Sequence, residues 1–248
     1  MMKTDYFSDR HTVRRYSDKK VNDALLLSIS ERAMKAPTTG GMQLYSVILT
    51  EEEPVRTKLA EAHFSQPAAV GAQVIVTVCA DLHRFERWCN LSGANPGFDN
   101  FISFTSAFLD ATIYAQQFCT IAELEGLGTC YLGTTLWQAP MISELLKLPE
   151  HVVPVCGIAL GWPAGEGEAT ERLPVNAVVH KEKYNDFSDK ELIELYRVKD
   201  EYPANKLYVA EHSKPSLAHV FTEVRYPLSM NEEFSAIIKA YLERQGLL

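Results

Sequence analysis

The sequence lacks every cysteine pattern that indicates a disulfide framework or a zinc site. Its five cysteines are an odd number, they are widely spaced, and no two of them form a C-x-x-C pair. Such usage is typical of reduced, buried thiols inside the cell. We therefore expect a cytoplasmic protein, and we assign no metal site.

Long apolar runs are also missing. The N-terminal segment MMKTDYFSDR has no apolar core of signal-peptide length, so we predict no export. The most apolar stretch, residues 101–126, is interrupted by Asp110, two glutamines and Glu123, which makes it too polar for a membrane span. We find no internal repeat, no low-complexity tract, and neither the G-x-G-x-x-G nor the Walker A spacing of nucleotide-binding loops.

Basic residues are outnumbered. There are 24 Lys and Arg against 32 Asp and Glu, which gives a net charge of −8. This balance argues against general binding of nucleic acid or of an anionic membrane, because both need a basic face. Any site for an anion must therefore be local. The 248 residues, 46% of them hydrophobic, are enough to bury one substantial core.

Helical and strand patterns interleave along the first two thirds of the chain. A helical period predicts helices over residues 21–37, where Asn22 caps the start and Pro37 ends the pattern, and over residues 53–64, 99–125 and 139–149. Runs of β-branched residues predict strands at 44–50, 73–81 and 152–162, and a shorter strand lies within 126–133. Because the order shows no clean βαβ repeat, we predict the α+β class.

The character of the chain changes after Pro174. Residues 184–208 and 230–248 have the pattern of charged amphipathic helices joined by a polar connector. We interpret about 180–248 as a helical C-terminal extension that wraps on the core or on a neighbouring subunit. Residues 1–248 would then form a single domain.

Positive charge is concentrated in the segment DRHTVRRYS, residues 9–17. In an extended segment, residues two apart point to the same side, so Arg10, Thr12 and Arg14 would converge while Val13 enters the core. Guanidinium groups together with a hydroxyl suit a phosphate monoester. The alternative is a solvated loop whose arginines pair with nearby aspartates.

Three later segments contain glycines, hydroxyl groups or a strand end. They are APTTGGMQLYSVI at 36–48, GLGTCYLGT at 126–134 and LGWPAGEGEATERLP at 160–174. Each one alone is explained as a connecting turn. In their joint order, however, the four segments resemble the nitroreductase family of FMN-dependent oxidoreductases, over roughly residues 5–180. The charged C-terminal helices resemble the oxygen-insensitive major nitroreductase and flavin reductase branch.

The resemblance implies a central mixed sheet flanked by helices and a tightly but non-covalently bound FMN. Arg10 and Thr12 would bind its phosphate, and Arg14 would lie near the ribityl chain and the N1–C2=O edge, with His11 between them. The backbone N–H of Gly133 would meet flavin N5. The other residues implied to contact the cofactor are Thr38, Thr39, Gln43, Gln66, Tyr131, Leu132, Thr134 and Arg172.

Two positions depart from the family pattern. Gly41 stands where the family often has Asn, so a side-chain contact is lost there or is replaced by backbone. Thr170 stands where a lysine is often found, two residues before Arg172. Phosphate binding would therefore depend mainly on Arg10 and Arg172.

The implied activity is NAD(P)H-dependent reduction by a ping-pong mechanism. FMN would accept hydride at N5 and pass two electrons to a nitroaromatic, a quinone or a similar flat acceptor, and no catalytic side chain is required. The family also implies a homodimer with the flavin at the subunit interface. The helix expected at 99–125 suits that interface, although a core helix explains its apolar pattern nearly as well.

Three alternatives remain open. The chain could be a flavin reductase that supplies reduced FMN, or a flavin-binding protein without turnover. It could also be a thiol enzyme that pairs Cys130 with His151 or His180, but no sequence feature brings these histidines to the thiol.

Selectivity for the nicotinamide is a separate prediction. The related branch carries an arginine-rich segment in its C-terminal extension, and arginines suit the 2′-phosphate of NADPH. The corresponding region here, NKLYVAEHSKPSLAH, offers Lys206, His212 and Lys214 but no arginine. We predict weaker selectivity for NADPH over NADH than in that branch.

Overall fold

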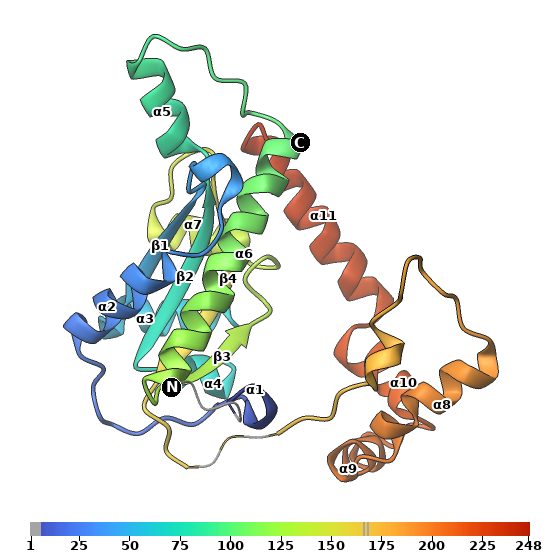
Figure 1. Cartoon of the computed structure of the whole chain (residues 1–248). Coiled ribbons are helices and arrows are strands. Elements are labelled where there is room, and N and C mark those ends of the chain that lie inside the picture. Colours follow the sequence, from blue (N-terminus) through green and yellow to red (C-terminus); the bar gives the residue numbers. More distant parts are fainter. Residues whose placement is uncertain (1–5, 166, 168) are drawn as a thin grey trace. The chain divides into compact units, whose positions relative to one another are not determined.

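A computed structural model describes residues 6–165, 167 and 169–248 of the chain (Figure 1). The chain divides into two compact units. The first consists of residues 1–168 with 235–248, and the second consists of residues 169–234. None of the helices in the described residues is both long and apolar enough to cross a bilayer.

The first unit is built on a four-stranded sheet of order β1-β2-β4-β3. Its strands are β1 (Tyr45–Thr50), β2 (Val74–Asp81), β3 (Gly128–Leu132) and β4 (Val152–Gly161). The α+β class is confirmed, but each of the three pairings is antiparallel, where a mixed sheet was expected. Strand composition predicts that a run is buried, but it carries no information about the direction in which neighbours pair.

The helices of the first unit mostly match the predicted ranges. They are α1 (Tyr6–Asp9), α2 (Asp23–Ala33), α3 (Glu53–Ala62), α4 (Pro67–Val70), α5 (His83–Leu91), α6 (Phe101–Leu124) and α7 (Ala139–Leu146). The Asn22 side chain accepts a hydrogen bond from the N–H of Ala24, as its predicted N-cap role requires. Helices α1, α4 and α5 were not expected. Asp81 is the last residue of β2, and its carboxylate accepts from the N–H of Arg84 in the first turn of α5.

The core lies between the sheet and α6, which runs along the sheet in Figure 1. Strands β2 and β4 are buried along their whole length, which explains their continuous apolar runs. One face of α6 is buried against them, and its largest core side chains are Tyr114 and Phe118. The sheet packed on α6 therefore forms the core of the first unit, and the loops at the strand ends project from it.

The second unit is helical. It contains α8 (Asp189–Asp200), α9 (Pro203–Glu211), α10 (Leu217–Val220), the π-helical turn η3 (Phe221–Arg225) and the 3₁₀ turn η2 (Val175–Ala177). A capping box of Ser188 and Glu191 begins α8. Helix α11 (Leu228–Arg244) starts in this unit and ends in the first one. The predicted helical extension is thus observed.

Candidate functional site

The arginine-rich segment is attached to the start of β3. The N–H of Val13 donates to the carbonyl oxygen of Thr129 at 3.1 Å, and the Val13 side chain is buried. The predicted inward orientation of Val13 is therefore confirmed. It packs so closely on Gly128 that a Cβ at this glycine would lie 2.5 Å from a Val13 methyl group. The residues on either side of Val13 are consequently held at the surface of the first unit.

Arg10 is oriented by a buried carboxylate at the end of α6. Its Nη2 donates to Oε1 of Glu123 at 3.1 Å, and its Nη1 donates to the hydroxyl of Thr12 at 3.3 Å. Glu123 also accepts from the hydroxyl groups of Tyr6 and Thr129. Burial and the Glu123 carboxylate both raise the pKa of Tyr6, so that its phenol remains a donor.

This arrangement differs from the solvated loop considered as the alternative, because the partner of Arg10 is a residue 113 positions away. Arg10 and Thr12 are brought together as predicted. A guanidinium has five N–H donors, and two of them are used in the contacts above. The Thr12 hydroxyl accepts from Arg10, so its own proton remains for another acceptor. These donors suit a phosphate. Arg10 lines a cavity of about 290 Å³ together with Asp9, His11, Glu123 and neighbouring residues, and Thr12 is not among the residues that line it.

The other end of β3 carries the second group of predicted residues. Gly133 lies four positions after Thr129, which corresponds to about 13 Å along a strand. A Cβ at Gly133 would meet no atom within 4 Å, so the backbone there is open to a close approach. The hydroxyl of Thr134 accepts from Nε2 of Gln66 at 3.4 Å. The structure therefore brings Gln66 to the β3 turn, next to the residues predicted with it, and its contact with a flavin stays a prediction.

Tyr131 and Leu132 point to opposite sides of β3, one to the surface and the other to the core. Leu132 is buried, whereas Tyr131 is partly exposed and its hydroxyl donates to Gln116 on α6 at 3.5 Å. Burial of the ring raises the pKa of Tyr131, which keeps this phenol neutral. Of these two residues, Tyr131 is the one whose side chain can reach a ligand.

The loop at 38–43 is organised quite differently. Thr38 and Thr39 both donate their hydroxyl protons to the carboxylate of Asp110, and the N–H of Thr39 donates to the same group at 2.8 Å. The N–H of Leu44 adds a fourth hydrogen bond. The two threonines were predicted to offer hydroxyls to the cofactor, but the structure directs these protons into the protein.

Sequence reasoning missed the roles of Asp110 and Glu123. Asp110 is 2% exposed in the middle of α6, whereas in the sequence it is only an interruption of an apolar run. The signal that could have indicated these roles is that Asp110 and Glu123 are the two charged residues of an otherwise uncharged helix. A carboxylate that is buried in such a helix must find hydrogen-bond donors elsewhere in the protein.

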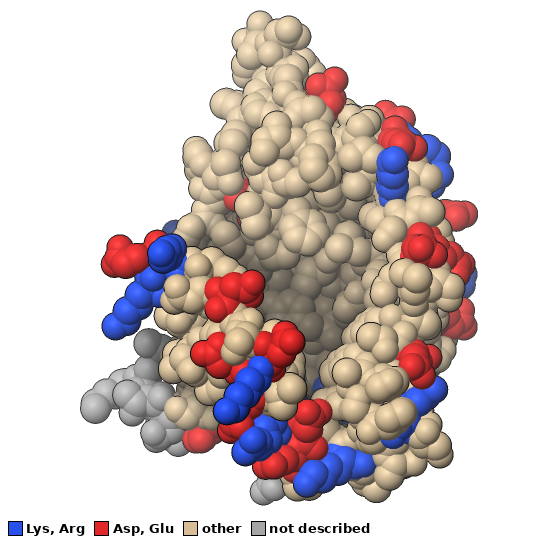
Figure 2. Space-filling view, turned by 90° about the vertical axis from the view of Figure 1, so that its right-hand side faces the viewer, with Lys and Arg blue, Asp and Glu red and all other residues tan. Residues whose placement is uncertain are grey.

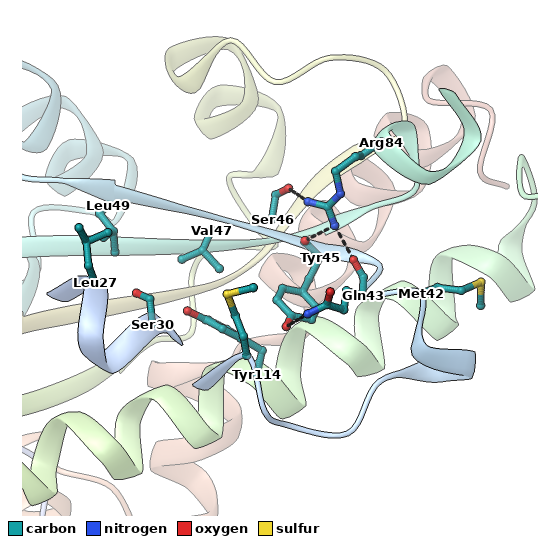
Figure 3. Close-up of a pocket in the computed structure, with 11 residues that line it drawn as sticks. Leu27, Ser30, Met42, Gln43, Tyr45, Ser46, Val47, Leu49, Arg84 and Tyr114 are labelled. Carbon is teal, nitrogen blue, oxygen red and sulfur yellow. Dashed lines mark hydrogen bonds between the residues drawn. The ribbon is translucent and has the colours of Figure 1, made fainter. Parts of the chain in front are cut away.

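Gln43 lines a separate cavity of about 430 Å³ between α2, β1 and α6 (Figure 3). At one end of it the guanidinium of Arg84 donates to the carbonyl oxygens of Gln43 and Tyr45 and to the Ser46 hydroxyl. Gln43 is the only predicted cofactor residue among those that line this cavity. We therefore do not assign the flavin ring to it.

Comparison with known proteins decides the family. The model of the nitroreductase family matches residues 8–162. The chain belongs to the nitroreductase family. A nitroreductase described as oxygen-insensitive and NADPH-dependent, from Salmonella typhimurium, is 30% identical over 72% of this chain and 73% of its own length. An FMN reductase (NADPH) from Bacillus subtilis is 28% identical over 71% of this chain and 72% of its own length.

The fold of this nitroreductase is shared over nearly its whole length. A crystal structure of a proposed oxidoreductase from Bacteroides fragilis superposes with a TM-score of 0.96 and 41% identity, covering 98% of this chain and 99% of that one. The predicted family and the predicted nitroreductase fold are confirmed, and the chain is an oxidoreductase enzyme.

Arg172 belongs to the second unit of the nitroreductase chain. Its Nη1 donates to the backbone oxygens of Thr170 and Glu171 and to the Thr170 hydroxyl. It borders a cavity of about 510 Å³ together with Leu173, Val175 and Lys199. Its pairing with Arg10 on one phosphate stays a prediction, as does the predicted contact of the exposed Arg14.

The thiol hypothesis gains no support. All five cysteines are buried free thiols, and Cys130 lies inside β3. His151 commits its Nδ1 to the carboxylate of Glu86 at 2.6 Å, and His180 lies in the second unit against Tyr184 and Phe187. Neither histidine is positioned by an observed contact to activate the thiol.

Proposed function

We propose that the chain is an FMN-dependent NAD(P)H oxidoreductase that reduces nitroaromatics, quinones or similar flat acceptors. The observation that carries this proposal is the pairing of Arg10 with Thr12 at one end of β3 and the open backbone of Gly133 at the other end. Together they offer hydrogen-bond donors for an anion beside the start of β3 and an open backbone just after its end. A phosphorylated flavin needs donors for its phosphate and a close backbone approach to its ring.

In this proposal, the residues of the chain bind the cofactor and orient its ring. Arg10 and the Thr12 hydroxyl would hold the phosphate, and the N–H of Gly133 would face the ring. When bound, FMN supplies the capacity to accept and donate hydride, which no amino-acid side chain provides. Tyr131 would line the ring with its neutral phenol, and Gln66 would contribute its amide.

Charge balance indicates that Arg10 does not act alone. Glu123 lies 3.1 Å from its guanidinium and compensates much of its positive charge. A phosphate monoester carries between one and a half and two negative charges near neutral pH, so a second cation is needed. Arg172 is the residue we propose for that role, with Arg14 nearer the ribityl chain and the pyrimidine edge.

A homodimer with the flavin at the interface is part of the proposal. The outer face of α6 exposes Phe101, Ile102, Leu109, Ile113 and Leu124, and both charged residues of this helix, Asp110 and Glu123, are turned inward. Figure 2 shows that the charged side chains of the face that it presents lie mostly in its lower part and along its sides. An exposed apolar helix face of this kind supports a subunit interface. Sedimentation of the purified protein measures the oligomeric state.

A flavin reductase that releases reduced FMN is the second candidate. The similarity to the FMN reductase (NADPH) of B. subtilis supports it. The two candidates differ in the fate of FMN, since a flavin reductase turns over added free FMN as substrate. A flavin-binding protein without turnover would remain oxidised in the presence of either nicotinamide.

Weaker NADPH selectivity remains a prediction. In the second unit, Lys214 is paired with Glu223 at 2.8 Å, and His212 directs Nδ1 to the carbonyl oxygen of Tyr208. The ion pair with Glu223 reduces the positive charge that Lys214 offers to a 2′-phosphate. We expect kcat/KM for NADPH to exceed that for NADH by less than about tenfold, or 1.4 kcal/mol. A preference of a hundredfold or more would contradict this.

The deciding experiment uses the purified full-length chain. We expect a yellow protein that carries FMN, is bleached anaerobically by NADPH or NADH, and recovers its colour on addition of a nitroaromatic or a quinone. Protein that neither carries FMN nor takes it up would overturn the proposed function. Cell fractionation of the native protein would test the cytoplasmic location, for which the five free thiols are the argument.

A further inference from the structure

His63 is a fully buried histidine directly behind the β3 turn. It follows α3, has no exposed surface, and its Nδ1 lies 2.9 Å from the hydroxyl oxygen of Thr134. The same oxygen accepts from Nε2 of Gln66 at 3.4 Å. Two side chains from the loop between α3 and α4 therefore meet the hydroxyl group of Thr134, which follows β3.

The protonation of His63 can be worked out from its surroundings. Burial lowers its pKa to about 4, so the ring is neutral at pH 7 and carries one N–H. Its Nε2 has no hydrogen-bond partner among the described residues. Buried N–H groups are left without an acceptor more rarely than acceptors are left without a donor. This favours the tautomer with the proton on Nδ1 and a bare Nε2.

The neighbouring strand agrees with a bare Nε2. A Cβ built on Gly157 of β4 would lie 3.3 Å from that nitrogen, so the glycine turns a Cα–H towards the ring edge. A lone pair tolerates such a C–H contact, whereas an N–H would meet another hydrogen. Gly157 thus supplies the space for the ring and also suits one of its two tautomers.

The consequence falls on Thr134. A hydroxyl has one proton and two lone pairs. With His63 and Gln66 both donating to it, its lone pairs are used and its proton is directed elsewhere. Among the described residues, no side chain or backbone group accepts that proton. Thr134 directly follows Gly133, the residue whose backbone N–H was predicted to meet the flavin ring.

We propose that His63 is a positioning residue that makes the hydroxyl of Thr134 a hydrogen-bond donor to the ring bound at the β3 turn. The proposal rests on the proposed function. It adds a second donor beside the N–H of Gly133. A donor at this edge strengthens its hydrogen bond when the ring gains electron density, and it therefore favours the reduced flavin over the oxidised one.

The first test needs no flavin. Histidine-selective ¹⁵N labelling of the full-length protein reports the tautomer of each ring, and the resonance lost in His63→Asn identifies His63. We expect Nδ1–H with a bare Nε2. An Nε2–H tautomer would overturn the proposal whether or not the protein binds FMN, which separates its failure from failure of the proposed function.

The second test measures the midpoint potential of FMN bound to full-length variants. We expect His63→Leu and Thr134→Val each to reduce the preference for reduced over oxidised flavin by about tenfold, which is a shift of about −30 mV for a two-electron couple. The double variant should shift no further, because both changes remove the same donor. His63→Asn should restore the wild-type potential, since its amide can donate from the position of Nδ1.

Thr135→Val is the matched control, because the hydroxyl of Thr135 already donates to the carbonyl oxygen of Leu132 at 2.8 Å. It should lower stability without moving the potential. Additive shifts in the double variant, or an unchanged potential in His63→Leu, would show that His63 serves only to fill space.

Discussion

Helix α6 carries two carboxylates, and each organises a threonine-containing loop in a different way. Near its middle, Asp110 collects the hydroxyl protons of Thr38 and Thr39 and closes their loop onto the core. Near its end, Glu123 binds Arg10. Thr12 accepts from that arginine, so its proton stays at the surface. Both loops were predicted to contact the cofactor through hydroxyl groups.

The difference shows that a hydroxyl in a motif is not yet a ligand contact. What decides its role is whether a buried acceptor lies closer than the ligand does. A buried carboxylate without hydrogen-bond donors is so unfavourable that nearby hydroxyl and N–H groups donate to it. The hydroxyls of Thr38 and Thr39 are therefore used inside the protein, whereas Thr12 keeps a proton for an external acceptor. The contacts of both segments with the cofactor stay predictions.

The largest expected effect is that of Asp110→Ala on stability. Four hydrogen bonds end on this carboxylate, and the N–H groups of Thr39 and Leu44 would lose their acceptor. We expect the free energy of unfolding to fall by about 3–4 kcal/mol in denaturant titrations. Asp99→Ala, an exposed change just before the same helix, should stay within about 0.5 kcal/mol. Equal losses in the two variants would mean that the Asp110 network contributes little.

Arg10→Ala should have the next largest effect, and it should act on binding. Loss of a charge-assisted hydrogen bond to phosphate raises the Kd for FMN by about 10- to 100-fold. Fluorescence titration of the apoprotein measures it. Arg32→Ala is the control, because Arg32 forms an exposed pair with Glu125 near the same end of α6. Full FMN occupancy of Arg10→Ala after dilution would contradict the anion site.

Thr12→Val and Thr39→Val test the comparison directly. Thr12→Val should raise the Kd for FMN by about fivefold with little change in stability, since one hydroxyl donor is worth about 1 kcal/mol. Thr39→Val should lower the unfolding free energy by about 1–2 kcal/mol and leave the Kd for FMN nearly unchanged. The comparison fails if the two variants have the same pattern of effects.

Gly41→Asn should have the smallest effect. Gly41 has a φ of +74°, and a Cβ there would meet no atom within 4 Å. Asn tolerates the left-handed region better than other residues with a side chain, so we expect a loss of less than about 1 kcal/mol. Gly41→Val should cost more, because β-branched residues are strained at positive φ. Thermal unfolding of both variants would distinguish them.

Much of the architecture could be predicted from local patterns. The apolar runs of β2 and β4, the Asn22 cap of α2 and the limits of α6 follow from periodicity and capping chemistry. The order of four short segments was enough to indicate the family, and the comparisons confirm it. Strand direction, by contrast, depends on which strands become neighbours, and no local pattern encodes that.

The sequence by itself determined the four strands and most of the longer helices, the α+β class, the inward orientation of Val13 and the residue types that a phosphate needs. Only the tertiary structure decided which hydroxyl protons are used internally and which remain for a ligand. The physical reason is that a hydroxyl donates to the nearest unsatisfied acceptor. Asp110, Glu123 and His63 reach partners that lie 71 to 113 positions away in the sequence, and they do so only after the chain has folded.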